Sequence, residues 1–421
     1  MRTATATPTP AASPSPSRAT AVREWAATAA RLVLAAAWAW AGIAKIGDPA
    51  AAVRAVRAYR LLPEWLAQGV GYGLPFLELA LAALLVAGLA TRLAALVSVA
   101  LLVVFLAGMI SAAARGLQIE CGCFGGGGEL AAGQYTAYTV EIVRDVALLL
   151  VAVFLARWPR SRLAADDAVR SLGVSAVDSA RIGPRRTAEA RRRLAELEER
   201  RRWEGERRVR VAGAVAVVLL VLVTGIGVGV QAARASGPPG PTPQAVSVET
   251  GVTVGRADAR VTLELYEDAQ CPACRQFEQE VGSTIAGWVE SGTVKVDYHI
   301  VAFLDRASST RYSSRAADAL YCSADAGVFV RYHDLLYANQ PPEGSAGLSD
   351  DQLLQLGRQA GATSDDFARC LREERYADFV SRITEQASRD GILGTPTVLV
   401  NGNVVQSVTL AALRAAVNEA T

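Results

Sequence analysis

Five stretches of the chain are apolar over a length that suits a membrane-spanning helix. A helix needs about 20 mostly apolar residues to cross the hydrocarbon core of a bilayer. The stretches cover residues 26–44, 69–90, 93–114, 136–156 and 211–230. This pattern predicts an α-helical membrane bundle of four spans plus a fifth, tethering span. A cleaved signal peptide is the alternative for the first stretch, but several further spans follow it.

After residue 246 the pattern changes to that of an α/β domain. Residues 261–280 begin with alternating apolar and polar positions, which predicts a strand, then a turn and a helix. A second strand is predicted at 294–301. Residues 394–408 hold two short strands around an Asn-Gly pair, which is typical of a type I′ hairpin, and a helix follows at 409–420. This order of elements predicts a thioredoxin fold.

The strand at 294–301 and Pro396 are separated by about 90 residues, which is too many for a loop. The segment therefore predicts an inserted helical subdomain at about 305–390. Its helices are expected at 313–338, 349–360, 364–373 and 375–390.

These patterns divide the chain into six segments. The first is rich in Ala, Thr, Pro and Ser and cannot bury a core, and a Pro/Gly run (SGPPGPTPQ) precedes the α/β domain. In order, the segments are a disordered tail (1–24), a four-helix membrane domain (25–156), an Arg-rich linker (157–210), the fifth span (211–230), a Pro/Gly linker (231–245) and the thioredoxin domain (246–421).

Charge gives the chain an expected orientation. Residues are 51% hydrophobic and 20% charged, which excludes a disordered protein, and a net charge of +2 offers no field for nucleic acid. Basic loops stay in the cytoplasm, and 157–210 is rich in arginine. We therefore expect a multi-pass protein of the cell membrane with a cytoplasmic N-terminus and everything after residue 231 outside. The basic loop 45–68 then also falls outside, which argues against this orientation unless it forms an amphipathic helix on the membrane surface.

Six cysteines form three pairs, all of which this orientation places on the oxidising side of the membrane. Cys271-Pro-Ala-Cys274 opens a helix directly after a strand. The positive end of a helix favours a thiolate at Cys271, while Cys274, one turn further, is expected to be less exposed and to resolve the mixed disulfide. A lone Cys-x-x-Cys can also bind zinc, but the strand-to-helix context favours redox chemistry, and we expect no metal.

The other two pairs call for different interpretations. Cys121 and Cys123, one residue apart, could close only a strained ring, which suits a labile redox disulfide. Buried thiols or a metal site are the alternatives there. Cys322 and Cys370 both lie in the helical insert, and the oxidising compartment favours a structural disulfide over two free thiols.

Four charged residues fall inside the predicted spans: Glu78, Glu141, Arg144 and Asp145. Such residues are expensive to bury in a membrane and are candidates for a functional role. Proton or quinone chemistry is one reading, with a quinone bound at the membrane domain. Ion pairing between helices near the membrane interface is the other. Separately, Glu141 and Arg144 are three residues apart and can pair on one helix face.

Two resemblances follow from these motifs. AGIAKIGDP (41–49) and CGCFG (121–125) within residues 25–156 resemble the MauE/DoxX family of redox-associated membrane proteins. That resemblance implies that the membrane domain supports disulfide chemistry by a thioredoxin-like partner.

The second resemblance covers residues 246–421. The motif V-G-x-x-D-A-x-V-T-L-x-x-Y-x-D-x-Q-C-P-x-C (254–274) together with GTPT resembles the DsbA-like thiol-disulfide oxidoreductases. It implies that Cys271 is the nucleophile, Cys274 its partner and Pro396, after Thr395, a cis proline beside them.

One position departs from the DsbA-like pattern. Much of that family has an acidic residue six positions before the first cysteine, where this chain has Leu265. Glu264 or Glu267 could take its place as a buried proton acceptor, and the sequence leaves the choice open.

The sequence thus predicts an enzyme that forms disulfides in exported, cysteine-containing clients, with its own membrane domain as the redox partner. No cofactor is expected in the thioredoxin domain. A disulfide reductase or isomerase is the alternative within the same chemistry. A membrane-tethered peptide-binding assembly factor without turnover is the alternative of a different class.

Overall fold

The computed structural model of the chain describes residues 18–117, 119–120, 128–129, 138–162, 164–166, 240–244 and 246–421, with scattered positions between 199 and 231. The chain divides into two compact units. The first comprises Met1–Trp40, Leu77–Leu106 and Val143–Val223. The second comprises Ala41–Phe76, Ala107–Ile142 and Thr224–Thr421.

Three helices among the described residues are long and apolar enough to cross a membrane, at Thr20–Ile46, Glu64–Ala87 and Thr91–Ala114. They correspond to α1 (Arg18–Ile46), α3 and α4, and coincide with the first three predicted spans. The fourth predicted span forms helix α5 (Tyr138–Arg157), whose first half carries three charged side chains. The fifth, 211–230, is described only in part, so the predicted count of four spans plus one stays a prediction.

The charged side chains of the predicted spans are partly internal. Glu78 and Asp145 are fully buried. Arg144 donates from Nε to Asp145 Oδ1 at 2.8 Å, because its long side chain can turn back along the helix toward its neighbour. Adjacent residues on a helix start about 100° apart, and the expected pairing with Glu141 therefore has a competitor in Asp145.

Helix α2 (Pro49–Ala58) forms the amphipathic segment expected in the basic loop. Asp48 is its N-cap and accepts a hydrogen bond from the backbone N–H of Ala51 at 2.9 Å, and Pro49 occupies the first helical turn. A proline fits there because its missing N–H would have no helical partner. The end of the AGIAKIGDP motif is thus a helix start, and the helix buries Ala and Val side chains on one face.

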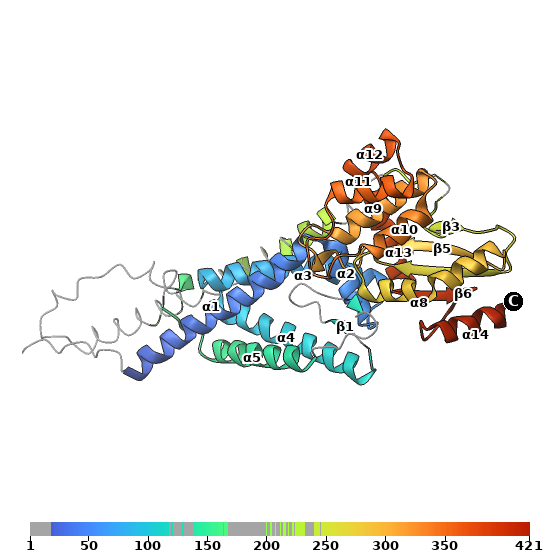
Figure 1. The fold of residues 1–421 in the computed structure, drawn as a ribbon. Coiled ribbons are helices and arrows are strands. Elements are labelled where there is room, and N and C mark those ends of the chain that lie inside the picture. Colours follow the sequence, from blue (N-terminus) through green and yellow to red (C-terminus); the bar gives the residue numbers. More distant parts are fainter. Residues whose placement is uncertain are drawn as a thin grey trace, which may run out of the picture. The chain divides into compact units, whose positions relative to one another are not determined.

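The thioredoxin domain is built on a five-stranded sheet with the strand order β3-β5-β4-β6-β7. Strands β4 and β5 are parallel, and every other neighbouring pair is antiparallel. The strands are β3 (Val252–Val254), β4 (Val261–Glu267), β5 (Val294–Ile300), β6 (Thr397–Val400) and β7 (Asn403–Val404). This topology confirms the α/β thioredoxin fold (Figure 1). A short β1–β2 pair (Ile119–Glu120 and Gly128–Glu129) belongs to the earlier part of the chain.

The turn between β6 and β7 has the predicted hairpin geometry. Asn401 and Gly402 have positive φ angles of 48° and 79°, which a type I′ turn requires at both central positions. The strands pair Leu399 with Val404 and Val400 with Asn403. The Asn-Gly pair therefore sets the register of this edge.

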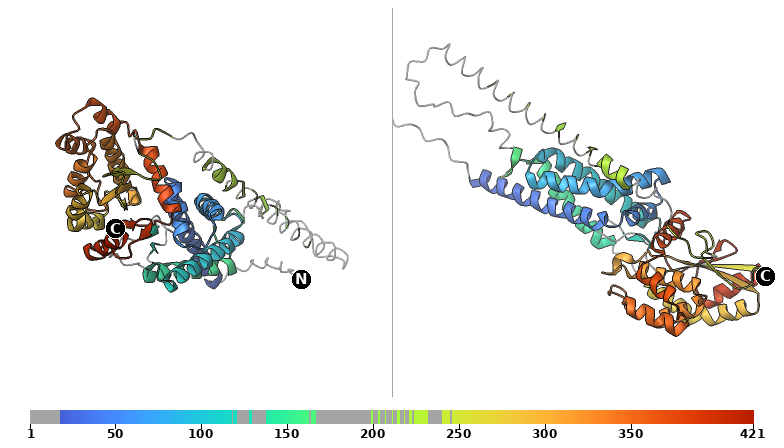
Figure 2. Two further views of the ribbon diagram at one scale, coloured as in Figure 1. Left: turned by 90° about the vertical axis from the view of Figure 1, so that its right-hand side faces the viewer. Right: turned by 90° about the horizontal axis from the view of Figure 1, so that it is seen from above.

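Helices cover the sheet and form the insert. Helix α8 (Pro272–Glu290) packs on β5 and α14 (Leu410–Ala420) packs on β6. The remaining elements, drawn together in Figures 1 and 2, are η2 (Asp305–Ala307), α9 (Tyr312–Asp325), α10 (Phe329–Ala338), α11 (Asp350–Ala360), α12 (Asp365–Arg372) and α13 (Ala377–Arg389). One prediction is wrong in detail. The single helix expected at 313–338 is two helices, because Gly327 adopts a φ of +71° that ends α9.

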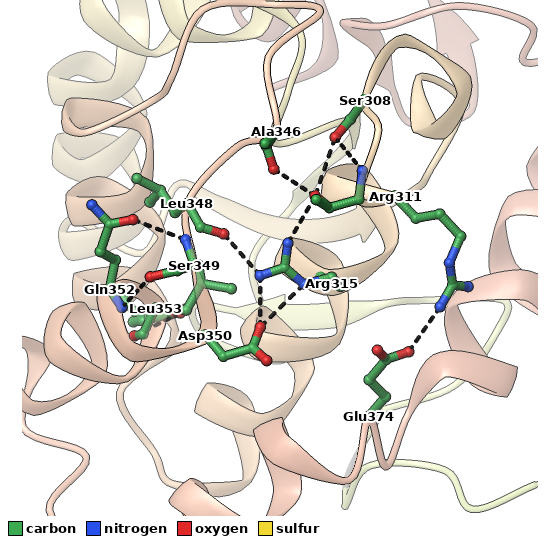
Figure 3. A network of polar contacts seen from close by, with 12 residues as sticks. Ser308, Arg311, Arg315, Ala346, Leu348, Ser349, Asp350, Gln352, Leu353 and Glu374 are labelled. Carbon is green, nitrogen blue, oxygen red and sulfur yellow. Dashed lines mark hydrogen bonds and ion pairs between the residues drawn. The ribbon is translucent and has the colours of Figure 1, made fainter.

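A polar network ties the start of α9 to the start of α11 (Figure 3). The Arg315 guanidinium donates to Asp350 Oδ1 at 2.6 Å and to the Leu348 carbonyl at 2.8 Å. Ser349 caps α11 with a reciprocal capping box through Gln352. These contacts fix the long connection between α10 and α11, which carries no regular structure of its own.

The insert also contains a disulfide between Cys322 on α9 and Cys370 on α12, which are 48 residues apart. Both residues belong to the largest hydrophobic cluster, whose buried members all lie between Val252 and Val417. The thioredoxin domain 246–421 therefore has a core of its own, and the bridge joins two helices within it.

Replacing both Cys322 and Cys370 by alanine should lower the free energy of unfolding of the 246–421 domain by about 2–4 kcal/mol, because the unfolded chain gains entropy without the crosslink. Urea unfolding measures the effect, and Cys271→Ser is the control that keeps the bridge. Thiol exchange at Cys271 should persist in the double variant. Equal midpoints for the wild type and the double variant would contradict the assignment.

Candidate active site: the Cys271–Cys274 pair

The two cysteines lie where β4 runs into α8. Strand β4 ends at Glu267, a short loop follows, and Cys271 is the N-cap of α8 with Pro272 in the first turn. Cys274 is one turn further along the same helix. Both thiols are free and both residues are 0% exposed. The exposed fraction therefore does not distinguish the two cysteines, and the expectation that Cys274 is the less exposed stays a prediction. The side chains of Leu304 and Tyr337 pack against the pair and help to bury Cys271 as well.

Cys271 contacts the loop that precedes β6. Its Sγ donates to the carbonyl oxygen of Thr395 at 3.3 Å, and the Thr395–Pro396 peptide bond is cis. A hydrogen bond from Cys274 lowers the pKa of the Cys271 thiol, and this outweighs the opposing effect of burial. Because the free N–H groups of a helix start act in the same direction, Cys271 is the thiol that ionises first.

Cys274 is affected in the opposite sense. Burial raises the pKa of its thiol well above the ordinary value, and its hydrogen bond to Cys271 and the negative charge of Glu267 add to the rise. The pair therefore combines one thiol that gives up its proton readily with one that holds it. This is the arrangement that a nucleophile and a resolving thiol need.

The insert holds the loop before Cys271 in place. Asp268 is buried, and its carboxylate accepts hydrogen bonds from the N–H of Gln270, the N–H of Leu304 and the hydroxyl of Ser313. Burial raises the pKa of Asp268 to about 6. Gln340, which follows α10, donates to the carbonyl of Cys271 at 2.9 Å. Residues of the insert therefore fix both the loop and the first cysteine.

A buried cluster of ionisable groups lies beside Cys274. Glu267 Oε2 and His333 Nε2 are 2.8 Å apart, and Glu278 on α8 completes the group. Burial raises the pKa of Glu278 to about 8. Burial lowers the pKa of His333, but hydrogen bonds to Asp334 and Glu267 and nearby negative charge bring it up to about 10. At neutral pH the cluster thus holds a proton on Glu278 and a charge on His333.

The same cluster is where the described part of the thioredoxin domain could ligate a metal ion. One ligand atom from each of Glu267, Glu278 and His333 lies within 4.8 Å of the others. A histidine must be neutral to bind a metal, whereas the surroundings of His333 favour its protonated form. The expectation of no metal stays a prediction. The cluster is better suited to holding protons than to binding a metal ion.

The structure resolves one choice that the sequence left open and adds two residues. Glu267 lies next to the cysteines, whereas Glu264 sits further back on β4, where burial and Asp297 raise its pKa. Glu278 could have been found, because it is seven residues after Cys271 and therefore two helical turns away on the same face. Nothing in the sequence signals His333, which comes from the insert.

The second predicted pair cannot be compared in the same way. Cys121 and Cys123 lie outside the described residues, between the short strands β1 and β2. Ile119, which precedes them, is buried in a cluster with Ala58, Ala112 and Leu393, all within the second unit. Leu393 is three residues before Pro396. The strand that leads to the Cys121 segment and the loop beside Cys271 therefore contribute to one buried cluster.

Two family models match the chain. The model of methylamine utilisation protein MauE matches residues 23–157, and a thioredoxin model matches residues 247–419. These ranges agree closely with the two domains predicted from the motifs.

Several proteins of known name are similar to part of this chain. Serine/threonine-protein kinase PknE of Mycobacterium tuberculosis is 34% identical over 119 residues, which cover 27% of this chain and 21% of the kinase. The chain thus spans about a fifth of the length of the first curated relatives that it matches. Probable disulfide bond formation protein D of Bacillus cereus is 26% identical over 158 residues, covering 37% of this chain and 72% of that protein. A solved structure, the reduced form of a disulfide bond oxidoreductase (DsbG) from Mycobacterium tuberculosis, shows 34% identity and a TM-score of 0.38 over 41% of this chain and 88% of its own.

Replacing Glu278 by Gln should change how stability depends on pH. The pKa of Glu278 is higher in the folded state (about 8) than its ordinary value of 4.5. Its contribution is therefore fully present below pH 4.5 and is lost as pH rises through 8. Relative to Glu278→Gln, the wild-type domain should lose stability between pH 5 and pH 8, on the order of 1–3 kcal/mol.

Urea unfolding of both proteins at the two pH values measures this difference. Glu280→Gln, an exposed position on the same helix, is the control and should leave the pH dependence unchanged. A constant difference between wild type and Glu278→Gln across this range would show that Glu278 is ionised in the folded state.

Proposed function

Because the chain joins a MauE-type membrane domain to a thioredoxin-fold domain that resembles disulfide bond formation proteins, we propose that it is a membrane-anchored thiol-disulfide oxidoreductase. It forms disulfides in exported, cysteine-containing proteins. The observation that carries this proposal is that the pKa of Cys271 is lowered and the pKa of Cys274 is raised, at a helix start beside the Thr395 carbonyl.

The reaction balances as a dithiol–disulfide exchange. A client thiolate attacks the Cys271 sulfur of the oxidised Cys271–Cys274 pair, so the pair's disulfide breaks and a mixed disulfide forms. The second client thiolate attacks its own partner sulfur, which releases Cys271 as a thiolate. The client loses two electrons and the cysteine pair gains them. The lowered pKa of Cys271 makes it the better leaving group.

In this scheme the buried cluster of Glu267, Glu278 and His333 supplies the proton of Cys274 and takes it back. When the mixed disulfide forms, the released Cys274 sulfur takes up a proton, because burial and nearby negative charge disfavour its thiolate. Reoxidation requires the reverse step. We assign Glu267 as the group that exchanges this proton, with Glu278 and His333 storing it, since the three groups lie together and the charge of Glu267 acts on the Cys274 thiol.

The membrane domain supplies the oxidant within the same chain. A Cys121–Cys123 disulfide accepts the two electrons from reduced Cys271 and Cys274 and becomes a dithiol. The buried cluster that Ile119 and Leu393 share supports this route. A second contact supports it too, because Arg57 on α2 donates to Glu385 at 2.5 Å and to Ser388 at 3.1 Å, all within the second unit.

The remaining parts of the proposal concern the membrane. We propose the orientation expected from the Arg-rich 157–210 segment, with the thioredoxin domain outside the cell and the spans in the lipid bilayer. A membrane quinone is the proposed final acceptor of the electrons. Glu78 and Asp145, both buried, are the candidates for taking up the protons that accompany its reduction.

The direction of electron flow can be measured in intact cells with a membrane-impermeant maleimide. For an oxidase, Cys271 should react only after a reductant is added, because its resting state is the disulfide. Cys271→Ser should abolish client disulfide formation, whereas Cys322→Ala should reduce it only through lower stability. Full labelling of Cys271 without a reductant would indicate a reductase. Labelling only after membrane disruption would refute the orientation.

The exchange between the two cysteine pairs predicts a trapped intermediate. With an added thiol oxidant, which takes up the two electrons that two thiols lose when they join, a variant with Cys274→Ser and Cys123→Ser should form a Cys271–Cys121 disulfide, and the matched variant with Cys274→Ser and Cys121→Ser a Cys271–Cys123 disulfide. Each should appear as a crosslink between the halves after cleavage in the 231–245 linker and vanish on reduction.

Arg57→Gln in these trapping variants should lower the crosslink yield, because the contact with Glu385 is lost. Arg54→Gln, on the same helix but paired with Asp48, is the matched control. Mixed disulfides with clients but none within the chain would mean that another protein reoxidises Cys271.

A further inference from the structure

A basic pocket lies in the first unit, far in sequence from every cysteine. It is a cavity of about 820 Å³ between the start of α1, the start of α4 and the segment that follows α5. Four arginines line it: Arg23, Arg92, Arg157 and Arg160. They are brought together from three separate stretches of the chain, all within the first unit.

The acidic side chains that line the same pocket are engaged elsewhere. Asp166 accepts hydrogen bonds from the backbone N–H groups of Ala90 and Thr91, at 2.9 and 3.1 Å, and so caps the start of α4. Glu24 pairs with Arg162 at 3.3 Å, which is not one of the four lining arginines. Among the described residues, no carboxylate pairs with Arg23, Arg92, Arg157 or Arg160, and the pocket keeps an excess of positive charge.

The pocket also contains a buried hydroxyl group that lacks a hydrogen-bond partner. Ser161 lines the pocket and is 2% exposed, yet its Oγ has no hydrogen-bond partner. A buried polar group without a partner is unfavourable. An anion in the pocket would accept a hydrogen bond from this hydroxyl as well as from the arginines.

The surroundings place the pocket at the level of a membrane surface. Trp158 lines it, with the Arg157 guanidinium 5.4 Å from the ring centre, and Trp25 lies nearby under Arg162. Tryptophan is enriched where membrane helices meet the headgroup region. Leu93 and Leu96 of the apolar helix α4 also line the pocket. The pocket therefore offers positive charge at its polar end and an apolar helix face beside it.

We propose that this arginine pocket binds a phosphate group, supplied by an anionic phospholipid whose acyl chains lie along α4. Arginine binds phosphate through two parallel hydrogen bonds. Basic pockets at the ends of membrane helices bind phospholipid headgroups. A soluble phosphate compound carries the same chemistry without the acyl chains, so the experiment compares both sources. The proposal involves none of the cysteines and stands apart from the redox function.

The full-length protein in nanodiscs provides the test. Replacing part of the phosphatidylcholine by phosphatidylglycerol should raise the melting temperature of the wild type. Arg92→Gln with Arg160→Gln should weaken binding of the anionic lipid roughly tenfold or more, since each arginine contributes charged hydrogen bonds. Arg331→Gln with Arg358→Gln, which removes the same charge from exposed positions of the thioredoxin domain, is the matched control and should keep the full shift.

Two further measurements make the outcome decisive. The melting temperature in pure phosphatidylcholine reports whether Arg92→Gln with Arg160→Gln still folds. If that glutamine variant is unstable, Arg92→Lys with Arg160→Lys should restore part of the lipid effect. Inorganic phosphate added to phosphatidylcholine nanodiscs tests the soluble source. A full shift with inorganic phosphate alone would uphold the phosphate site and assign it to a soluble ligand. An equal lipid shift in wild type and in Arg92→Gln with Arg160→Gln would overturn the proposal.

Discussion

A thiol pair buried at the end of a strand needs groups around it that balance its charge, and this need shapes the thioredoxin domain. Cys271 and Cys274 are both inaccessible to solvent, so water cannot stabilise a thiolate there. The protein provides substitutes on both sides of the pair. The helix start and the neighbouring thiol favour negative charge on Cys271, whereas Glu267 opposes it on Cys274. Burial and these neighbours thus shift the pKa values of two thiols that are only one helical turn apart in opposite directions.

The balance depends on contributions from both the sheet and the insert. Glu267 comes from the end of β4 and Glu278 from α8, but the cation that accompanies them, His333, is on α10. Asp268 joins the loop before Cys271 to Ser313 at the start of α9. The core cluster is continuous across strands, α8 and the insert helices. The helical insert is therefore part of the site as well as part of the core.

The sequence predicted the elements that depend on local chemistry. The strand that begins at 261, the Cys-Pro-Ala-Cys helix start and the Asn401-Gly402 hairpin follow from alternation, proline placement and turn preference. The insert was recognised from its length, but its first helix was wrongly joined across Gly327, because the apolar spacing continues through that residue. His333 could not be placed at all. Its role depends on how α10 packs against α8, which brings it to Glu267, 66 residues away in sequence, and such a contact leaves no periodic pattern in the sequence.

The position of Gln340 has a consequence for how such domains diverge. Its side-chain amide donates to the carbonyl groups of both Ala269 and Cys271, so the residue after α10 fixes the backbone on which the first sulfur is carried. The four residues from Cys271 to Cys274 therefore cannot be moved to another fold with their redox properties unchanged. Grafted onto a thioredoxin fold with a different insert, they would keep their sequence but lose the backbone support and the buried cation that distinguish the two sulfurs. Evolution of the redox properties would have to proceed through paired changes in the insert and the helix start.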